Sequence, residues 1–246
     1  METCKNCNHP VADKFCPNCG QSAHTPRFSG KELFHEFMHG FLHLDHGIFF
    51  TMKELLLRPG TTIKNYLHGK RKSYFNPFTY ILVLSAFTAF LISKIHWGSL
   101  LVEIGIVQPG EVDAAAWKYS LKHFSWRLLL GIPVAAFVSR IFYYKHEFNF
   151  SELMIANSYL RGQIDLFMLI LFALLSFVHL QVVRSGITIF FLSAWMIYIA
   201  WAFAGLFNDK INIWNFIKGF FCALICFILE MLILNLVILR RLDVLF

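Results

Sequence analysis

The sequence predicts an all-α polytopic membrane protein with about five transmembrane helices, preceded by a small N-terminal ribbon and an amphipathic juxtamembrane helix. The chain is 57% hydrophobic and only 15% charged, whereas soluble domains contain roughly 45–50% apolar and 25% charged residues. Its apolar residues gather in long runs from residue 78 onward, and four of its six cysteines lie within the first 20 residues. Because a water-soluble fold could not bury so much apolar surface, we expect the chain in a membrane.

Residues 1–22 are expected to form a zinc ribbon. Two C-x-x-C pairs lie eight residues apart in this segment, formed by Cys4, Cys7, Cys16 and Cys19. Each pair can turn its sulfurs toward one point, and Gly20 suits the left-handed backbone that such turns favour. Four thiolates complete a tetrahedral site, so we expect the zinc to be structural and the ribbon to be unfolded without it. The alternative is two redox pairs, although no βαβ pattern surrounds them.

Residues 28–77 are expected to form an amphipathic interfacial helix and a basic linker. Ser29 and Glu32 make a capping box that begins a helix, and the Arg58-Pro59-Gly60 sequence ends it. Between these limits apolar residues share one face at a 100° step, which is typical of a helix on a membrane surface or against a bundle. Glycines near its middle would permit a break.

The polar face of this helix carries a stripe of histidines, which are His35, His39, His43 and His46. Imidazoles one turn apart could bind a second metal ion, or sense pH near their ordinary pKa of about 6.5. The simpler interpretation is a solvated face, since glutamate and lysine residues share it. The sequence at 35–39 matches H-E-x-x-H, but no such arrangement with a third metal ligand is recognised.

The linker ends in a basic cluster, Lys70, Arg71 and Lys72, flanked by Tyr66 and Tyr74. We expect the basic side chains to contact anionic lipid headgroups and the tyrosines to lie at headgroup level, which would anchor the linker. The alternative is a specific headgroup or substrate site.

The transmembrane domain, residues 78–246, contains five apolar stretches of about 17 residues or more, enough for a hydrocarbon core of ~30 Å. They cover approximately 78–95, 128–144, 164–183, 187–206 and 217–239. The third and fourth are expected to form a hairpin that turns at Arg184-Ser185-Gly186. Residues 147–163 carry charges among apolar residues, which favours an interfacial or re-entrant helix.

Six Lys and Arg residues lie between positions 53 and 72, just before the first span, whereas the loop after that span mixes both signs. The positive-inside rule therefore predicts a multi-pass protein of the cell inner membrane with a cytoplasmic N-terminus. Five spans then place the C-terminus outside, which conflicts with Arg240 and Arg241. An even number of spans would remove the conflict.

Polar residues inside the spans are functional candidates, because burying a charge in hydrocarbon is costly. The three that we single out are Asp165, His179 and Glu230. Glu230 shares one helix face with Cys222 and Cys226. A salt bridge to Arg140 or Arg161, or a protonated carboxyl bonded between helices, is the structural alternative to a role in transport or catalysis.

Three motifs carry a resemblance to a known family: C-x2-C…F-C-x-x-C-G up to Gly20, L-L-x-R-P-G at 55–60, and Y-x-x-G-K-R-x-x-Y-x-x-P at 66–77. They resemble a bacterial domain-of-unknown-function family of membrane proteins with an N-terminal zinc ribbon. The motifs cover about the first 80 residues. The resemblance implies the architecture and no catalytic residue.

These observations favour a non-enzymatic membrane protein whose cytoplasmic ribbon mediates interaction with a protein partner or regulation. The first alternative is a small ion or lipid transporter or channel that uses Glu230, His179 and Asp165. The second is a membrane-embedded enzyme acting on lipid, for which we find no G-x-S-x-G or paired acidic motif and no H-E-x-x-H arrangement with a third ligand. The net charge of +7 comes largely from residues beside apolar segments, so nucleic acid is not an expected partner; membrane lipids are, and a homo-oligomer is compatible with the sequence.

Overall fold

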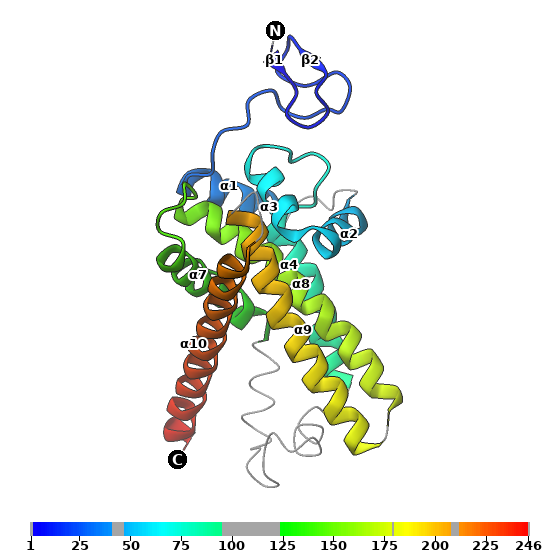
Figure 1. Cartoon of the computed structure of the whole chain (residues 1–246), viewed down its shortest axis with the longest axis vertical. Coiled ribbons are helices and arrows are strands. Elements are labelled where there is room, and N and C mark those ends of the chain that lie inside the picture. The colour runs from blue at the N-terminus through cyan, green and yellow to red at the C-terminus, as the bar shows by residue number, and fades with distance from the viewer. Residues whose placement is uncertain (1, 41–46, 95–123, 179, 208–211, 246) are drawn as a thin grey trace.

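The computed structural model describes residues 2–40, 47–94, 124–178, 180–207 and 212–245 (Figure 1). The ribbon contains one small antiparallel sheet, in which β1 (Glu2–Thr3) pairs with β2 (Pro10–Val11), and a bridge joins Phe15 to Ser22. Eight α-helices follow in the described part of the chain. They are α1 (Gly30–Gly40), α2 (Ile48–Leu57), α3 (Pro59–Leu67), α4 (Pro77–Lys94), α7 (Phe124–Phe142), α8 (Phe150–Phe177), α9 (Gln181–Phe207) and α10 (Ile213–Leu245).

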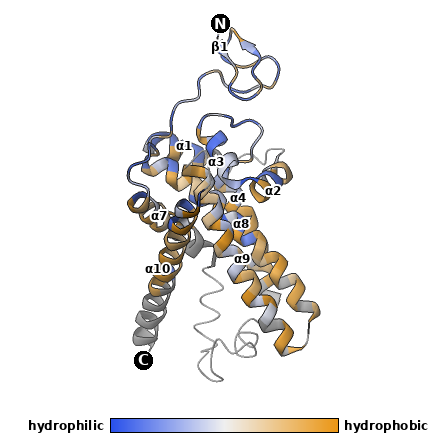
Figure 2. Cartoon of the chain, viewed as in Figure 1, coloured by the Kyte–Doolittle hydropathy of each residue, from blue (hydrophilic) through white to orange (hydrophobic). Residues whose placement is uncertain are grey.

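Three helices contain stretches long and apolar enough to cross a membrane: Phe150–Leu175 in α8, Gly186–Phe207 in α9 and Ile213–Glu230 in α10. Figure 2 shows that apolar residues dominate these helices, whereas the ribbon is largely hydrophilic. Shorter apolar stretches, Pro77–Leu91 and Leu129–Phe142, lie in α4 and α7. The chain is therefore a mostly helical membrane protein, and the number of five spans stays a prediction.

The third span differs from the expectation, because α8 runs without interruption from Phe150 to Phe177. Residues 150–163 are its first half and not a separate interfacial helix. The helix begins with a capping box between Asn149 and Glu152. Its charged residues have partners on other segments, Glu152 with Arg27 and Arg161 with Glu230, and Tyr159 is fully buried. The prediction for 147–163 was therefore wrong.

The predicted turn at Arg184-Ser185-Gly186 was also wrong, since these residues lie within the first two turns of α9. The hairpin itself is present, but α8 ends at Phe177 and α9 begins at Gln181. A single glycine lowers helix stability by only about 1 kcal/mol. Nothing packs within 4 Å of the position where Gly186 would carry a Cβ, so the helix can pass through this glycine without a close neighbour on that side.

The juxtamembrane segment forms several short helices. α1 begins at the predicted capping box, where the Ser29 amide donates to Glu32 Oε2 over 3.1 Å. α2 ends at Leu57, next to the predicted stop, and Pro59 then occupies the first turn of α3, which the sequence analysis treated as linker. The Arg58 guanidinium binds Glu54 with Nε–Oε2 and Nη2–Oε1 distances of 2.7 and 2.8 Å, and this hydrogen bond lowers the pKa of Glu54.

α2 and α3 pack on the end of α9. The Tyr198 hydroxyl of α9 donates to the Leu55 carbonyl over 3.0 Å. Gly60 lies so close to Gly205 and Leu206 that a Cβ at position 60 would overlap their backbone. The outer face of α2 is apolar, with Phe49 81% exposed. The juxtamembrane helices are thus part of the same core as the apolar helices, while α2 keeps an outward apolar face.

Tyr66 also differs from its expected place at headgroup level, because only 1% of its surface is exposed. Its ring meets that of Tyr159 edge to face, with centroids 5.3 Å apart, and its hydroxyl donates to Glu36. Burial raises the pKa of Tyr66 well above its ordinary value, so the hydroxyl stays a donor. The Tyr159 hydroxyl in turn donates to the Phe75 carbonyl over 2.6 Å.

Candidate metal centre and buried polar cluster

The two C-x-x-C pairs form matching turns in the ribbon. In the first, the Asn8 amide donates to the Cys4 carbonyl over 2.8 Å, and in the second the Gly20 amide donates to the Cys16 carbonyl over 2.9 Å. Asn8 and Gly20 have positive φ angles of 60° and 73°. The left-handed conformation expected at Gly20 is therefore present, and Asn8 takes it in the other turn, as asparagine readily does.

The four sulfurs converge on one point. All lie within 4.8 Å of one another, and the Cys4–Cys19 and Cys7–Cys16 sulfur distances are 3.6 and 3.5 Å. A tetrahedral zinc thiolate site with Zn–S bonds of about 2.3 Å has S–S edges of about 3.8 Å. The donor set therefore fits a metal ion, and its four protein ligands would leave no open position for a substrate.

Local hydrogen bonding and burial act on the ligand thiols in opposite directions. The backbone at His9 hydrogen-bonds to Cys7 and lowers the pKa of its thiol to about 6. Burial raises the pKa of the Cys16 thiol to about 11. Near neutral pH a metal ion must therefore displace a proton from Cys16, since a thiolate is the ligand.

Gln21 joins the ribbon to the segment after α3. Its Nε2 donates to the Gly69 carbonyl over 2.7 Å, and its Oε1 accepts from the Arg71 and Lys72 amides over 3.0 and 3.1 Å. The side chain is 4% exposed and lies two residues after Cys19. Gln21 was not among the residues predicted to be functional, although its place directly after the C-x-x-C-G turn was a usable signal.

Gly69, the glycine of the Y-x-x-G-K-R motif, has a φ of 104°. A Cβ there would approach Thr25 Oγ1 to 2.6 Å and Lys5 Cδ to 2.9 Å. Ser73 Oγ also hydrogen-bonds to Asn6 Oδ1 over 3.1 Å. The motif therefore forms the surface that receives the ribbon, which explains a glycine at position 69.

Arg71 is engaged within the protein. Its Nη2 donates to the Pro26 carbonyl over 2.6 Å, and its guanidinium lies 3.7 Å from the centre of the Phe28 ring. Burial lowers the pKa of Arg71. Lys70 and Lys72 are exposed, so lipid headgroup contact stays a prediction for these two lysines.

A second connection leads from the ribbon's linker to α8. Arg27 binds Glu152 through Nε–Oε1 and Nη2–Oε2 distances of 3.0 and 2.8 Å, and Nη2 also donates to the Glu147 carbonyl over 2.8 Å. Glu152 is 2% exposed, so its carboxylate depends on this arginine for its counter-charge. The Asn149 side chain donates to the Phe28 carbonyl over 2.8 Å.

The predicted histidine site is only partly within the described residues. His35 is exposed on α1 and His39 belongs to the same helix, whereas His43 and His46 lie outside the described part of the chain. Among the described residues the four cysteines are the one group of histidine, cysteine, aspartate and glutamate side chains placed to hold a metal ion.

The intramembrane polar residues gather between α4, α7, α8 and α10. Arg161 of α8 forms an ion pair with Glu230 of α10, with an Nη1–Oε2 distance of 3.1 Å and a second contact from Nη2 to Oε1. This is one of the salt bridges that the sequence left open. Arg140 is not involved, since its Nη1 donates to the Phe148 carbonyl over 2.9 Å.

The rest of this cluster consists of Asp165 and uncharged polar side chains. Cys222 lies 4.0 Å from Ser139 Oγ, which Asn157 Nδ2 also approaches to 3.3 Å. Asp165 is 1% exposed, and its Oδ2 has no hydrogen-bond partner among the described residues. His179, the third candidate, lies outside the described part of the chain.

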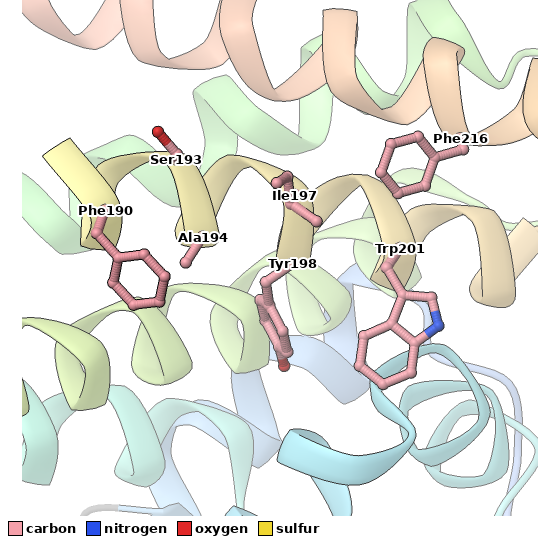
Figure 3. Close-up of a pocket in the computed structure, with 7 residues that line it drawn as sticks. All are labelled: Phe190, Ser193, Ala194, Ile197, Tyr198, Trp201 and Phe216. Atoms are coloured by element: carbon pink, nitrogen blue, oxygen red, sulfur yellow. The ribbon is translucent and has the colours of Figure 1, made fainter.

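A groove of about 500 Å³ runs along α9 (Figure 3). Its lining residues are Phe190, Ser193, Ala194, Ile197, Tyr198, Trp201 and Phe216. The two hydroxyls on it are already used, because Ser193 donates to the Ile189 carbonyl and Tyr198 to that of Leu55. Apart from the indole N–H of Trp201, the groove therefore offers mainly apolar contacts.

Comparison with known families matches residues 45–89 to the family described as "Protein of unknown function (DUF3667)". The matched segment contains α2, α3 and much of α4, including the R-P-G and Y-x-x-G-K-R motifs. No curated protein and no solved structure matches the chain. Over residues 45–89 the chain is therefore similar to this family, whose description assigns no activity.

Proposed function

We propose that this protein is a non-enzymatic component of the bacterial inner membrane, and that its zinc-loaded ribbon is a cytoplasmic module for protein interaction and regulation. A closed four-thiolate site gives zinc a structural task. The positive-inside distribution of residues 53–72 supports a cytoplasmic ribbon. No activity is needed to account for either feature.

The observation that carries the proposal is the Gln21 side chain. Gln21 lies two residues after Cys19, the last expected metal ligand, and its side chain makes three hydrogen bonds to residues 69–72. These residues follow α3, which packs on α9 through Gly60 and Gly205. The metal-dependent fold of the ribbon is thus joined to a membrane helix through one buried side chain, so a partner on the ribbon could influence the helices.

Photo-crosslinking from the ribbon tests this function. A photoreactive amino acid replaces Phe15, which is 63% exposed on the ribbon. We expect a distinct cross-linked protein in cells with the wild-type metal site, and loss of that product in the Cys4→Ser/Cys7→Ser variant while the membrane domain still inserts. A matched probe at Leu130, 68% exposed on the membrane helix α7, should not yield the product. Identical products with and without the cysteines would show that the ribbon recruits nothing.

Gln21→Ala separates interaction from regulation. The variant keeps all four ligands and loses the hydrogen bonds to residues 69–72. We expect it to bind zinc and retain the cross-linked partner, but to leave the connection between Cys19 and α1 more accessible to protease. If Gln21→Ala is cleaved no faster than the wild type, this side chain does not join the ribbon to the helices.

The transport alternative receives less support from the geometry. Glu230 is paired with Arg161, which explains its presence in an apolar helix without a transported ion. One observation favours a path for charge: the buried Oδ2 of Asp165 has no hydrogen-bond partner in the described part of the chain.

A further inference from the structure

Three ionisable side chains, one basic and two acidic, come together between the helices of the bundle. Arg161 and Asp165 lie one turn apart on the same face of α8, and Glu230 reaches Arg161 from α10. If all three were ionised, one guanidinium would face two carboxylates and the cluster would have a net charge of −1. A buried uncompensated charge is costly, in hydrocarbon above all.

The hydrogen bonds show where the imbalance lies. Both terminal nitrogens of Arg161 contact Glu230. Arg161 Nε and Asp165 Oδ2 are both buried and have no partner among the described residues. A donor and an acceptor without partners thus lie one helical turn apart. The guanidinium of Arg161 pairs with Glu230 and not with Asp165.

Among the described residues, the surrounding elements supply no other counter-charge. On α7 the guanidinium of Arg161 lies against Gly131, where a Cβ would approach its Cζ to 2.8 Å. α4 contributes Thr88, whose hydroxyl is 3.4 Å from the Asp165 carbonyl, and Tyr80, which donates to Gln163 over 2.6 Å. On α10, Cys226 lies near Arg161, and on α9 the Tyr198 hydroxyl is taken by Leu55.

We propose that Arg161, Asp165 and Glu230 form a proton-binding site that holds one proton shared between its two carboxyl groups. In the arrangement described here Asp165 is the neutral acid and Glu230 is the carboxylate bound to Arg161. In the alternative arrangement Asp165 gives its proton to Glu230 and takes over the guanidinium. Each arrangement contains one proton, one carboxylate and one guanidinium, so charge and atoms balance.

The two arrangements differ in access and in packing. The Glu230 side chain is 28% exposed, whereas Asp165 is 1% exposed. A proton on Glu230 is therefore held nearer the surface of the bundle, while one on Asp165 is enclosed. Transfer also moves the guanidinium from a partner on α10 to one on its own helix, which removes the ion pair between α8 and α10.

Infrared spectroscopy of the full chain in lipid nanodiscs at pH 7 tests the proposal through the carbonyl band of protonated carboxylic acids. We expect one such group in the wild type. Asp165→Asn and Glu230→Gln should each abolish the band, because the remaining carboxyl then has Arg161 to itself and ionises. Arg161→Gln should double it, since neither carboxyl retains a counter-charge. Glu147→Gln, which alters an exposed carboxyl, is the matched control and should change nothing.

Each outcome of these measurements either supports the shared proton or contradicts it. Absence of the band in the wild type would show that no proton is held. Persistence in Asp165→Asn, or in Glu230→Gln, would show that the proton is not shared between these groups. Asparagine and glutamine keep the shapes of the two acids, so these variants should elute from size exclusion as the wild type does. If Arg161→Gln fails to fold, Asp165→Asn and Glu230→Gln still test whether the proton is shared.

Discussion

At the scale of single residues, the cysteines of the ribbon differ sharply from those of α10. Cys16 lies with three other sulfurs within 4.8 Å, whereas Cys222 is a buried thiol beside Ser139. A ribbon of this size has almost no apolar core, so metal binding must supply much of its folding free energy. The two kinds of cysteine should therefore respond differently to the same substitution.

Cys16→Ser is expected to remove bound zinc and unfold the ribbon, since three thiolates no longer complete the site. Metal analysis of the purified protein should find one zinc per chain in the wild type and less than a tenth of that in the variant. Cys222→Ser is the matched control, because it removes a buried thiol outside the site, and it should keep one zinc. Equal zinc in both variants would contradict the assignment of the ligands.

Zinc affinity should fall as the pH is lowered. The Cys16 thiol, whose pKa is raised to about 11 by burial, carries a proton near neutrality that zinc must displace. Protons therefore compete with the metal, and each displaced proton weakens binding by about tenfold per pH unit. Competition with a chelator at pH 8 and pH 6 measures this. An affinity that does not change with pH would show that Cys16 binds no metal as a thiolate.

At the scale of helices, the contact of α3 with α9 depends on two glycines. A Cβ at position 60 would overlap the backbone of Gly205 and Leu206, and backbone cannot move aside as a flexible side chain can. The close approach brings α3, and with it the residues that bind Gln21, onto a membrane helix. This explains a glycine after proline in the R-P-G motif.

Gly60→Ala is expected to destabilise the protein by about 1–3 kcal/mol through overpacking. Gly186→Ala is the matched control, since it lies in helix α9 with nothing within 4 Å of its Cβ position, and it should stabilise by about 0.5–1 kcal/mol. Thermal unfolding in detergent compares the two. A Gly60→Ala variant as stable as the wild type would mean that α3 does not approach α9 so closely.

At the scale of the whole molecule, the ribbon and the C-terminal end of α10 lie at opposite ends of the long axis (Figure 1). The α8–α9 hairpin and α10 both extend away from the ribbon. The number of spans stays a prediction, and five spans would place the ribbon and the end of α10 on opposite sides of the membrane. Arg240 and Arg241, which contradicted the positive-inside rule, lie near the end of α10.

Reporter fusions test this topology. With five spans and a cytoplasmic ribbon, a fluorescent protein fused before residue 1 should fluoresce in the cytoplasm, and alkaline phosphatase fused after residue 246 should be active in the periplasm. The reciprocal fusions should be inactive. A C-terminal phosphatase without activity, next to a fluorescent C-terminal fusion, would require an even number of spans.

Several features could be read directly from the residues. The metal ligands, the capping box at Ser29 and Glu32 and the stop at Arg58-Pro59 depend on interactions within a few positions of the chain, and the structure contains all of them. The start of α8 was missed although Asn149 and Glu152 form a capping box. The charged residues at 147–163 favoured an interfacial helix instead, because the partners that neutralise them lie far away in the sequence.

The helical membrane architecture and the clustering of the four N-terminal cysteines follow from the residues alone, since long apolar runs and C-x-x-C spacing act locally. The folded structure was needed to show which distant groups meet: Gln21 with residues 69–72, Arg27 with Glu152, and Arg161 with Glu230 in preference to Asp165. Each of these joins positions at least 48 residues apart. The physical reason is that a buried polar group takes whichever partner the packing of helices brings within hydrogen-bond distance, and no local periodicity encodes that choice.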